Sequence, residues 1–376
     1  MGKIVMRTMK MLTVDLGLNY KHYAKDVGMI PYLLQKMYEW ECKILGPKKI
    51  DNYIKPYDDY AVETIFPENV YNNDIKNIAL YIKEHAREYD VLNLYHINTR
   101  NNLHFCNLFH KYNPNGIVYL KLDLGFRGLD MCKADGFLKR WYKKKLFHTA
   151  DVISDENQDV CVQLSNFYKC NVDFVPNGWY GKNDFYRGER KIDFLYVGRI
   201  GIKEKGVDIL LDAFAQMRCE ANLHLVGKIE DSFLQEIEEW KMKHPKASKH
   251  VFFHGEIRDK KELNYIYDIS KVLVIPSRWE SFGIVLVEGL SHGCFILASS
   301  TVSAASSILN DNIGFIFESE NSASLRNSME NLEKKAINRE IIYSTATDYN
   351  WESIVEGLNK LLIEAYSRKS NHQSGE

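Results

Sequence analysis

The stretch that decides the fold is VIPSRWESFGIVLVEGLSHGC, residues 274–294. It opens with the end of an apolar run that is typical of a strand, continues through a short polar loop, and enters a helical pattern near Gly283. Glu280 lies in the loop, and Glu288 follows within the apolar helix. Because ligands bind beyond the carboxyl ends of parallel strands, these carboxylates mark a candidate ligand site.

The same strand-and-helix pattern extends over most of the chain. Strand-like runs occur at 91–97, 116–124, 150–155, 172–178, 192–199, 222–228, 250–257, 271–277 and 294–300. Helical patterns such as 206–217 and 231–244 separate them. This alternation predicts an α/β protein with parallel sheets that are covered on both faces.

A glycine- and charge-rich segment at 176–191 lacks apolar periodicity and precedes a new strand. We therefore predict two Rossmann-like, doubly wound domains, 1–185 and 186–350, that face each other across a cleft. The length of 376 residues suits two domains.

The composition is that of an ordinary globular protein, with 45% hydrophobic and 26% charged residues. The net charge of -1 gives no electrostatic case for nucleic acid as a partner. Seven widely spaced cysteines without a CxxC pair argue against a disulfide framework or a structural zinc site. Neither a signal peptide nor a membrane-spanning apolar run is evident, so we expect a cytoplasmic protein with at most peripheral membrane contact.

Two cations lie at and just after the end of the strand-like run at 192–199. Arg199 closes this run, and Lys205 comes directly before the helix at 206–217. Two cations beside a helix N-terminus suit a diphosphate, because the free N–H groups and the helix dipole also attract negative charge. The alternative is a pair of solvated surface cations.

The helix that begins near Gly283 adds further polar groups to the same edge. Backbone amides of Gly283, Ile284 and Val285 would point toward the ligand, and glycine permits a close approach. Glu280 and Glu288 would repel phosphate, so they suit sugar and ribose hydroxyls. A nucleotide-diphosphate sugar would satisfy all these groups, whereas the alternative is a helix with an acid in its first turns.

These segments carry a family resemblance. ESFGIVLVE resembles the E-x7-E motif of retaining glycosyltransferases of family four, which have the GT-B fold. VGRIGIKEKGVDILLDAF resembles the G-R…K-G segment of that family, and VPNG resembles its I-P-N-G segment. The match runs in order over roughly residues 172 to 300, whereas the first half of the chain matches loosely.

The resemblance implies a role for each matching residue. Arg199 and Lys205 would bind the donor diphosphate and stabilise the leaving phosphate. Glu280 would hold the donor sugar, and Glu288 would bind the ribose hydroxyls. The amides of residues 283–285 would contact sugar and phosphate, and the backbone near Ile257 would contact the base.

The resemblance also implies the reaction. A hexose-type sugar would pass from a nucleotide-diphosphate sugar, with UDP favoured, to a saccharide or glycolipid acceptor in cell-surface polysaccharide assembly. The anomeric configuration would be retained. The chain has no D-x-D motif, so we expect no obligatory metal. We also expect no cofactor, because the nucleotide-diphosphate sugar is a co-substrate.

The acceptor side departs from the family pattern. Where the family commonly has a His-Asp pair, this chain has Leu122 and Asp123, so the aspartate is kept and the histidine is missing. His96 matches another histidine position of the family, although a lone histidine is often structural. Asp123 and His96 are the acceptor-side candidates, and the identity of the acceptor stays open.

Two helices bear on membrane contact and domain organisation. Residues 137–148, FLKRWYKKKLFH, form a basic amphipathic pattern that would either pack on the core or lie on an anionic bilayer at the inner face of the plasma membrane. Residues 351–369 suit the final helix that packs back on the first domain in this family.

Two other functions remain open on sequence, and a third is disfavoured. The chain could be a non-catalytic sugar-nucleotide-binding partner in a biosynthetic complex, or a nucleotide-sugar epimerase of related fold. A phosphorylase would need a pyridoxal-phosphate lysine site, and no motif for one is present in the sequence.

Overall fold

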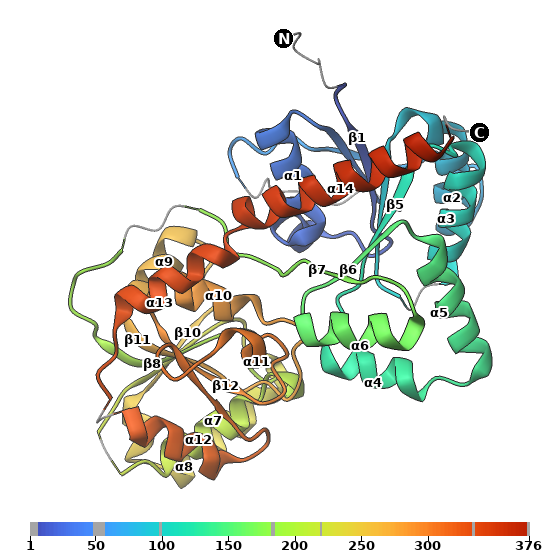
Figure 1. Cartoon of the computed structure of the whole chain (residues 1–376). Helices are drawn as coiled ribbons and strands as arrows, with labels where there is room; N and C mark the ends of the chain where they lie inside the picture. The colour runs from blue at the N-terminus through green and yellow to red at the C-terminus, as the bar shows by residue number, and fades with distance from the viewer. Residues whose placement is uncertain are drawn as a thin grey trace. The chain divides into compact units, whose positions relative to one another are not determined.

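The computed structural model describes residues 7–47, 57–97, 100–181, 185–218, 220–332 and 335–373. Its contacts divide the chain into two units (Figure 1). Unit 1 consists of Met1–Leu124, Gly128–Asn177 and Trp351–Glu376, and unit 2 consists of Gly125–Arg127 and Gly178–Asn350.

Unit 1 is built on a seven-stranded parallel sheet with the order β3-β2-β1-β4-β5-β6-β7. The strands are β1 (Lys10–Val14), β2 (Glu41–Leu45), β3 (Glu63–Ile65), β4 (Val91–Tyr95), β5 (Ile117–Lys121), β6 (Val152–Asp155) and β7 (Asp173–Phe174). Every residue of β4 and β5 is buried, as expected for parallel strands with helices on both faces.

Seven α-helices belong wholly or mainly to unit 1 in the described part of the chain. They are α1 (Asp26–Tyr38), α2 (Asp74–His85), α3 (Arg100–Tyr112), α4 (Gly125–Ala134), α5 (Phe137–Thr149), α6 (Gln158–Tyr168) and α14 (Trp351–Gln373). The last helix returns from the far end of the chain and contacts α1 and β5 (Figure 1). Unit 1 is therefore completed by residues that follow unit 2 in the sequence.

Unit 2 contains a six-stranded parallel sheet with the order β10-β9-β8-β11-β12-β13. The strands are β8 (Ile192–Val197), β9 (Leu223–Val226), β10 (Val251–Gly255), β11 (Ser270–Ile275), β12 (Phe295–Ser299) and β13 (Gly314–Phe317). Since β8 lies beside β11 at the centre of the sheet, the loops after these two strands leave the same edge side by side.

The helices of unit 2 connect and cover these strands (Figure 1). They are α7 (Val207–Ala215), α8 (Leu234–Lys243), α9 (Lys260–Asp268), α10 (Ile284–Ser291), α11 (Ala305–Ile308), α12 (Ser322–Asn331) and α13 (Arg339–Ala346). A single core of buried aliphatic and aromatic side chains joins the sheet to α7 and α10.

The predicted fold class, with two parallel Rossmann-like sheets, is confirmed. The strands predicted from 192 to 300 appear as β8–β12. The first three strands of unit 1 and the last strand of unit 2 were not predicted. None of the described helices combines the length and the apolar character needed to cross a bilayer.

Candidate active site

The carboxyl edge of the unit 2 sheet gathers most of the predicted donor-site residues. Arg199 follows β8, Ile257 follows β10, and Glu280 follows β11. All strands of this sheet are parallel, so the three residues leave it at one edge. Lys205 ends a short 3₁₀ turn, Lys203–Lys205, on the connection between β8 and α7.

Lys205 and Glu280 form a direct ion pair. The Nζ atom of Lys205 donates to Oε1 of Glu280 at 2.6 Å and to Oε2 at 3.0 Å. The two side chains are 25% and 19% exposed, so the pair is partly shielded from water and still accessible to a ligand. The sequence assigned these residues to neighbouring parts of one ligand, but it did not predict that they bind each other.

Gly206 holds the lysine turn against the end of β11. Its backbone is left-handed, with φ of 65°, and it is the N-cap of α7. A Cβ atom at this position would lie 2.0 Å from the carbonyl oxygen of Pro276. Only glycine permits this close approach, so the start of α7 and the loop that carries Glu280 are held together.

Arg278 holds the 3₁₀ turn Lys203–Lys205 in place through hydrogen bonds. The sequence analysis did not identify this residue. Its backbone N–H donates to the carbonyl of Glu204 at 2.8 Å, and its Nη1 atom donates to the carbonyl of Lys203 at 2.8 Å. Its guanidinium also binds both carboxylate oxygens of Asp208, at 2.8 and 2.6 Å. The hydrogen bonds to Asp208 raise the pKa of Arg278 above its usual value, so the guanidinium that holds the turn stays charged.

The position of Arg278 in the quoted stretch, two residues before Glu280, was the available signal. A bidentate arginine–carboxylate pair fixes geometry better than a single contact does. Burial raises the pKa of Asp208, but the hydrogen bonds and charge of Arg278 hold it below its ordinary value. Arg278 therefore acts on the site by positioning Lys205.

The backbone of Glu280 is fixed on its other side by residues 301–303. Its N–H donates to the carbonyl of Thr301 at 3.4 Å, and its own carbonyl accepts from the N–H of Ser303 at 3.2 Å and the hydroxyl of Ser303 at 3.1 Å. Gly283 follows with φ of 89° and caps α10. The carboxylate is thus presented from a braced loop directly before a helix N-terminus.

Gly283, Ile284 and Val285 form the cap and first turn of α10, as predicted. The first N–H groups of a helix have no partner inside it, so these amides are suited to donate hydrogen bonds to an anion or a hydroxyl oxygen. The side chains of Ile284 and Val285 pack against the core of unit 2, which fixes the orientation of this turn.

Glu288 lies further along α10 and is partly buried. Its Oε2 atom accepts a hydrogen bond from the hydroxyl of Tyr267 at 3.2 Å. Burial raises the pKa of Glu288, and the charge of Lys260 opposes this rise. Burial likewise lowers the pKa of Lys260, against the opposing charge of Glu288. Lys260 and Tyr267, both on α9, are further residues that the sequence analysis did not single out.

Arg199 and Ile257 are less constrained than the residues above. The side chain of Arg199 is exposed, and it forms no ion pair with any described residue. Its carbonyl accepts a hydrogen bond from the hydroxyl of Tyr196 at 2.9 Å. Ile257 is partly buried against the core of unit 2, between β10 and α9. The structure therefore joins Lys205 to Glu280 directly, while Arg199 and Ile257 share only the sheet edge with them.

The acceptor-side candidates lie in unit 1, at the carboxyl edge of its sheet. His96 follows β4 and Asp123 follows the neighbouring strand β5. Both have left-handed backbones although neither is glycine, with φ of 63° and 70°. Such strained residues are enriched at functional sites, which favours a functional reading of this edge.

Buried charges surround Asp123. Lys121 is fully buried and donates to the carbonyl of Val175 at 3.0 Å. Burial, with the charge of Asp123 and a hydrogen bond to it, raises the pKa of Glu156 well above its ordinary value. The ionised form of Glu156 is therefore disfavoured beside Asp123. The sequence signal for Glu156 was its position directly after the strand-like run at 150–155.

The basic helix α5 divides its apolar residues between the core and the surface. Leu146 and Phe147 are buried, whereas Phe137, Leu138 and Trp141 are 82%, 76% and 55% exposed. The packing alternative raised by the sequence therefore applies only to the C-terminal half of the helix. Its N-terminal half presents apolar side chains among lysines.

Comparison with protein families gives a match to one part of the chain. Residues 182–349 match the family model described as glycosyl transferases group 1. This range lies within unit 2 and includes Arg199, Lys205, Glu280 and Glu288.

Two curated proteins are related in sequence. A Klebsiella pneumoniae protein, described as an uncharacterized 41.2 kDa protein in the cps region, is 26% identical over 186 residues. This match covers 44% of the present chain and 49% of the relative, so it spans about half the length of that protein. An uncharacterized glycosyltransferase of Methanocaldococcus jannaschii is 23% identical over 348 residues, which are 84% of this chain and 93% of the relative.

Solved structures are similar over almost the whole chain. The apo form of WaaB, a lipopolysaccharide outer core galactosyltransferase, aligns with a TM-score of 0.70 at 14% identity and covers 95% of this chain and 99% of its own. The Anabaena protein HepE, in complex with UDP and glucose, aligns with a TM-score of 0.62 at 15% identity and covers 98% and 100%. The chain therefore has the GT-B fold, and the family match over its second unit supports a glycosyltransferase.

Proposed function

We propose that this protein is a retaining glycosyltransferase that transfers a hexose-type sugar from a nucleotide-diphosphate sugar to a saccharide or lipid-linked saccharide. The observation that carries the proposal is the contact of 2.6 Å between Lys205 and Glu280, held before a helix N-terminus at the carboxyl edge of unit 2. An ammonium group suits a departing phosphate, and a carboxylate suits sugar hydroxyls.

The ion pair would open when the donor binds. Lys205 would turn to the diphosphate, helped by Arg199, and Glu280 would accept hydrogen bonds from the sugar. Glu288 would bind the ribose hydroxyls, and the backbone near Ile257 would contact the base. UDP is the proposed nucleotide, supported by the complex of HepE with UDP and glucose.

Transfer would break the bond between the anomeric carbon and the diphosphate oxygen. The acceptor hydroxyl would attack from the face that the diphosphate leaves, and its proton would pass to the departing oxygen. Negative charge grows on the diphosphate in this step, so Lys205, Arg199 and the amides of α10 would lower the barrier most. Removal of one such fixed donor typically slows catalysis by about 10²–10³. These groups would make an obligatory metal unnecessary.

The acceptor would be recognised by unit 1, with Asp123 and His96 as the candidate residues. We propose an acceptor in cell-surface polysaccharide or glycolipid assembly. The description of WaaB as a lipopolysaccharide galactosyltransferase and the cps region of the Klebsiella relative are consistent with that class. The exposed aromatic side chains and lysines of α5 (Phe137–Thr149) support peripheral contact with an anionic membrane at the cytoplasmic face.

The test is sugar transfer with matched lysine variants. The purified chain is incubated with UDP-, GDP- and ADP-sugars and a panel of saccharide and lipid-linked acceptors, with and without EDTA. We expect one UDP-sugar to be used in EDTA, and we expect Lys205→Ala and Glu280→Ala each to lose at least about 100-fold in kcat. Lys203→Ala, in the same 3₁₀ turn but with an exposed side chain, should retain activity.

Wild-type turnover in Lys205→Ala or Glu280→Ala would disprove the site assignment. The same assay separates the alternative functions. An epimerase would convert a UDP-sugar without an acceptor. A non-catalytic partner would leave every donor intact, while its melting temperature would still rise with the bound nucleotide.

A further inference from the structure

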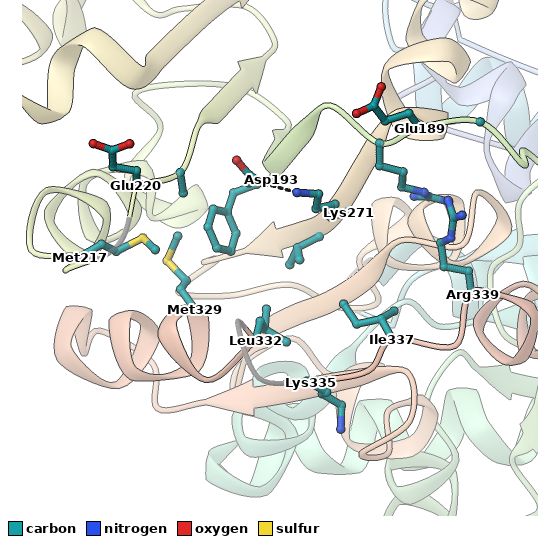
Figure 2. A pocket seen from close by; sticks show the side chains of 15 residues that line it. Glu189, Asp193, Met217, Glu220, Lys271, Met329, Leu332, Lys335, Ile337 and Arg339 are labelled. Carbon is teal, nitrogen blue, oxygen red and sulfur yellow. Dashed lines mark hydrogen bonds and ion pairs between the residues drawn. The ribbon is translucent and has the colours of Figure 1, made fainter.

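A cavity of about 500 Å³ lies at the amino edge of the unit 2 sheet, opposite the edge that carries Glu280 (Figure 2). Its lining comes from the residues before and at the start of β8, from the start of β11, and from a set of residues near β9, α12 and α13: Met217, Glu220, Ala221, Met329, Leu332, Lys335, Ile337 and Arg339. The volume is within the range of small-molecule sites, and the proposed function makes no use of it.

Two arginines meet at one end of this cavity. Arg190 precedes β8 and is 8% exposed, and Arg339 begins α13. Both approach Gly293: a Cβ atom there would lie 3.1 Å from Nη2 of Arg190 and 3.4 Å from the carbonyl oxygen of Arg339. Burial and the positive charge of Arg190 lower the pKa of Arg339. Two like charges are thus held together in a partly closed space.

The hydrogen bonds of these arginines are incomplete. Arg190 donates from Nη1 to the carbonyl of Ser270 and from Nη2 to the carbonyl of His292, the latter at 2.5 Å. Its Nε atom and the Nη1 atom of Arg339 are buried without a hydrogen-bond partner. Neither guanidinium forms an ion pair with any carboxylate among the described residues. Buried donors of this kind normally have an acceptor, so the arginine end of the cavity favours an anionic ligand.

Other charged side chains that line the cavity either contact a neighbouring side chain or lie away from the two arginines. Lys271 is paired with Asp193 at 2.6 Å, as the dashed line in Figure 2 marks. The ammonium of Lys335 lies 5.0 Å from the ring centre of Phe315. Glu220 lies at the end of the cavity away from Arg339 (Figure 2). Glu189 also lines the cavity, on the same side as Arg339 (Figure 2), but it forms no ion pair with either arginine in the described part of the chain. Two guanidinium groups therefore share this end of the cavity with one carboxylate among the described residues.

The rest of the wall is largely apolar. Figure 2 shows Met217, Met329, Leu332 and Ile337 around the space that leads away from Arg339. A ligand that fills the cavity would place its anionic group on the arginines and an apolar group against these side chains.

We propose that this cavity binds a small phosphomonoester that carries a short apolar group. A phosphomonoester has close to two negative charges at neutral pH, which matches two adjacent guanidinium groups better than a single carboxylate does. The planar donors of arginine also fit the phosphate oxygens in a bidentate manner. This inference does not depend on the proposed transferase activity.

Calorimetric titration of the full chain tests the proposal with three probes: inorganic phosphate, n-hexyl phosphate and hexanoate. We expect hexyl phosphate to bind at least tenfold more tightly than either of the other two. Arg339→Ala should weaken hexyl phosphate at least tenfold, and Arg339→Lys should weaken it less. Ile337→Ala should weaken hexyl phosphate while leaving inorganic phosphate unchanged. Arg368→Ala removes an exposed arginine of α14 and should bind as the wild type does.

Lys205→Ala controls for binding at the donor edge. Loss of hexyl phosphate binding in Lys205→Ala, with binding kept in Arg339→Ala, would overturn the proposal. Equal affinities for all three probes would overturn it as well. Thermal unfolding checks that each variant is folded, and if Arg339→Ala is not, Ile337→Ala carries the test. Because the readout is binding, an absence of sugar transfer would not affect the result.

Discussion

Glu288 is a hydrogen-bonded carboxylate in a partly buried environment that disfavours its negative charge. Its carboxylate lies against the Tyr267 hydroxyl on a helix that packs into the core, and burial raises its pKa. A carboxyl with a higher pKa in the folded state binds more protons there than in the unfolded chain. In the pH window between the two pKa values, stability therefore falls as the pH rises.

We predict that Glu288→Gln removes this contribution. Without ligand, the melting temperature of the wild type should fall relative to Glu288→Gln as the pH rises from about 4.3, the ordinary pKa of glutamate. The difference in the free energy of unfolding between the two proteins should reach about 1.4 kcal/mol for each unit by which the pKa of Glu288 is raised. Thermal unfolding from acidic to neutral pH measures it, with the exposed Glu364→Gln as the control. Parallel pH profiles for wild type and Glu288→Gln would contradict the prediction.

Lys205 and Glu280 differ from Glu288 because they form an ion pair with each other in the structure without ligand. Replacing either residue leaves the other without its partner, so the single variants are not independent. The combined effect of Lys205→Ala and Glu280→Ala should accordingly be smaller than the sum of the two effects on kcat.

At the scale of elements, the site depends on helix starts that glycine brings into close contact with strand ends. Gly206 caps α7 against the carbonyl of Pro276, and Gly283 caps α10 beside Glu280. Both have left-handed backbones. The backbone at Gly206 also has no room for a side chain, so this residue sets the distance between the lysine turn and the end of β11.

We predict that Gly206→Ala costs at least about 2 kcal/mol of stability and also displaces Lys205, because strain and a clash with backbone act together. Gly255→Ala is the matched control: its φ is 71°, but a Cβ atom there meets nothing within 4 Å. It should cost only about 1 kcal/mol, from backbone strain alone. Denaturant unfolding compares the two variants. Equal losses of stability in the two variants would mean that the clash with the carbonyl of Pro276 adds nothing to the cost of Gly206→Ala.

At the scale of the whole molecule, the two units are not two consecutive halves of the chain. The helix α14 follows unit 2 in the sequence but belongs to unit 1. It buries Trp351, Val355, Leu358 and Leu362, each at most 2% exposed. Full burial of each such side chain contributes about 1.5–3 kcal/mol as an upper estimate, so together they rival the stability of a typical domain.

We predict that a chain truncated after Asn350 loses the cooperative unfolding of unit 1 while unit 2 keeps its own core. Limited proteolysis of the truncated chain should leave a resistant fragment that corresponds to unit 2. A chain truncated after Gln373 keeps all the buried residues of α14 and should melt as the full chain does. If truncation after Asn350 left the melting of both units unchanged, the assignment of α14 to unit 1 would be wrong.

The sequence by itself determined the fold class and the residues at the carboxyl edge of unit 2. Parallel strands that are covered on both faces must be apolar almost throughout, and this gives them a visible pattern between turn residues. That pattern located β8–β12, and the motif around Glu280 then placed the carboxylates after a strand. The early strands of unit 1, β1 to β3, escaped prediction because each begins with a charged residue, Lys10, Glu41 and Glu63, which shortens its apolar run.

Only the tertiary structure decided which of these residues touch. Lys205 and Glu280 are 75 positions apart, and they meet because β8 lies directly beside β11 while β9 and β10 extend the sheet to the other side. Strand order and packing also produce the other contacts of this kind. They are the hydrogen bonds of Arg278, the approach of the Pro276 carbonyl to Gly206, and the two arginines around Gly293. Local sequence patterns report burial and backbone preference, whereas contacts between distant segments follow from strand order and packing, which no short stretch of sequence encodes.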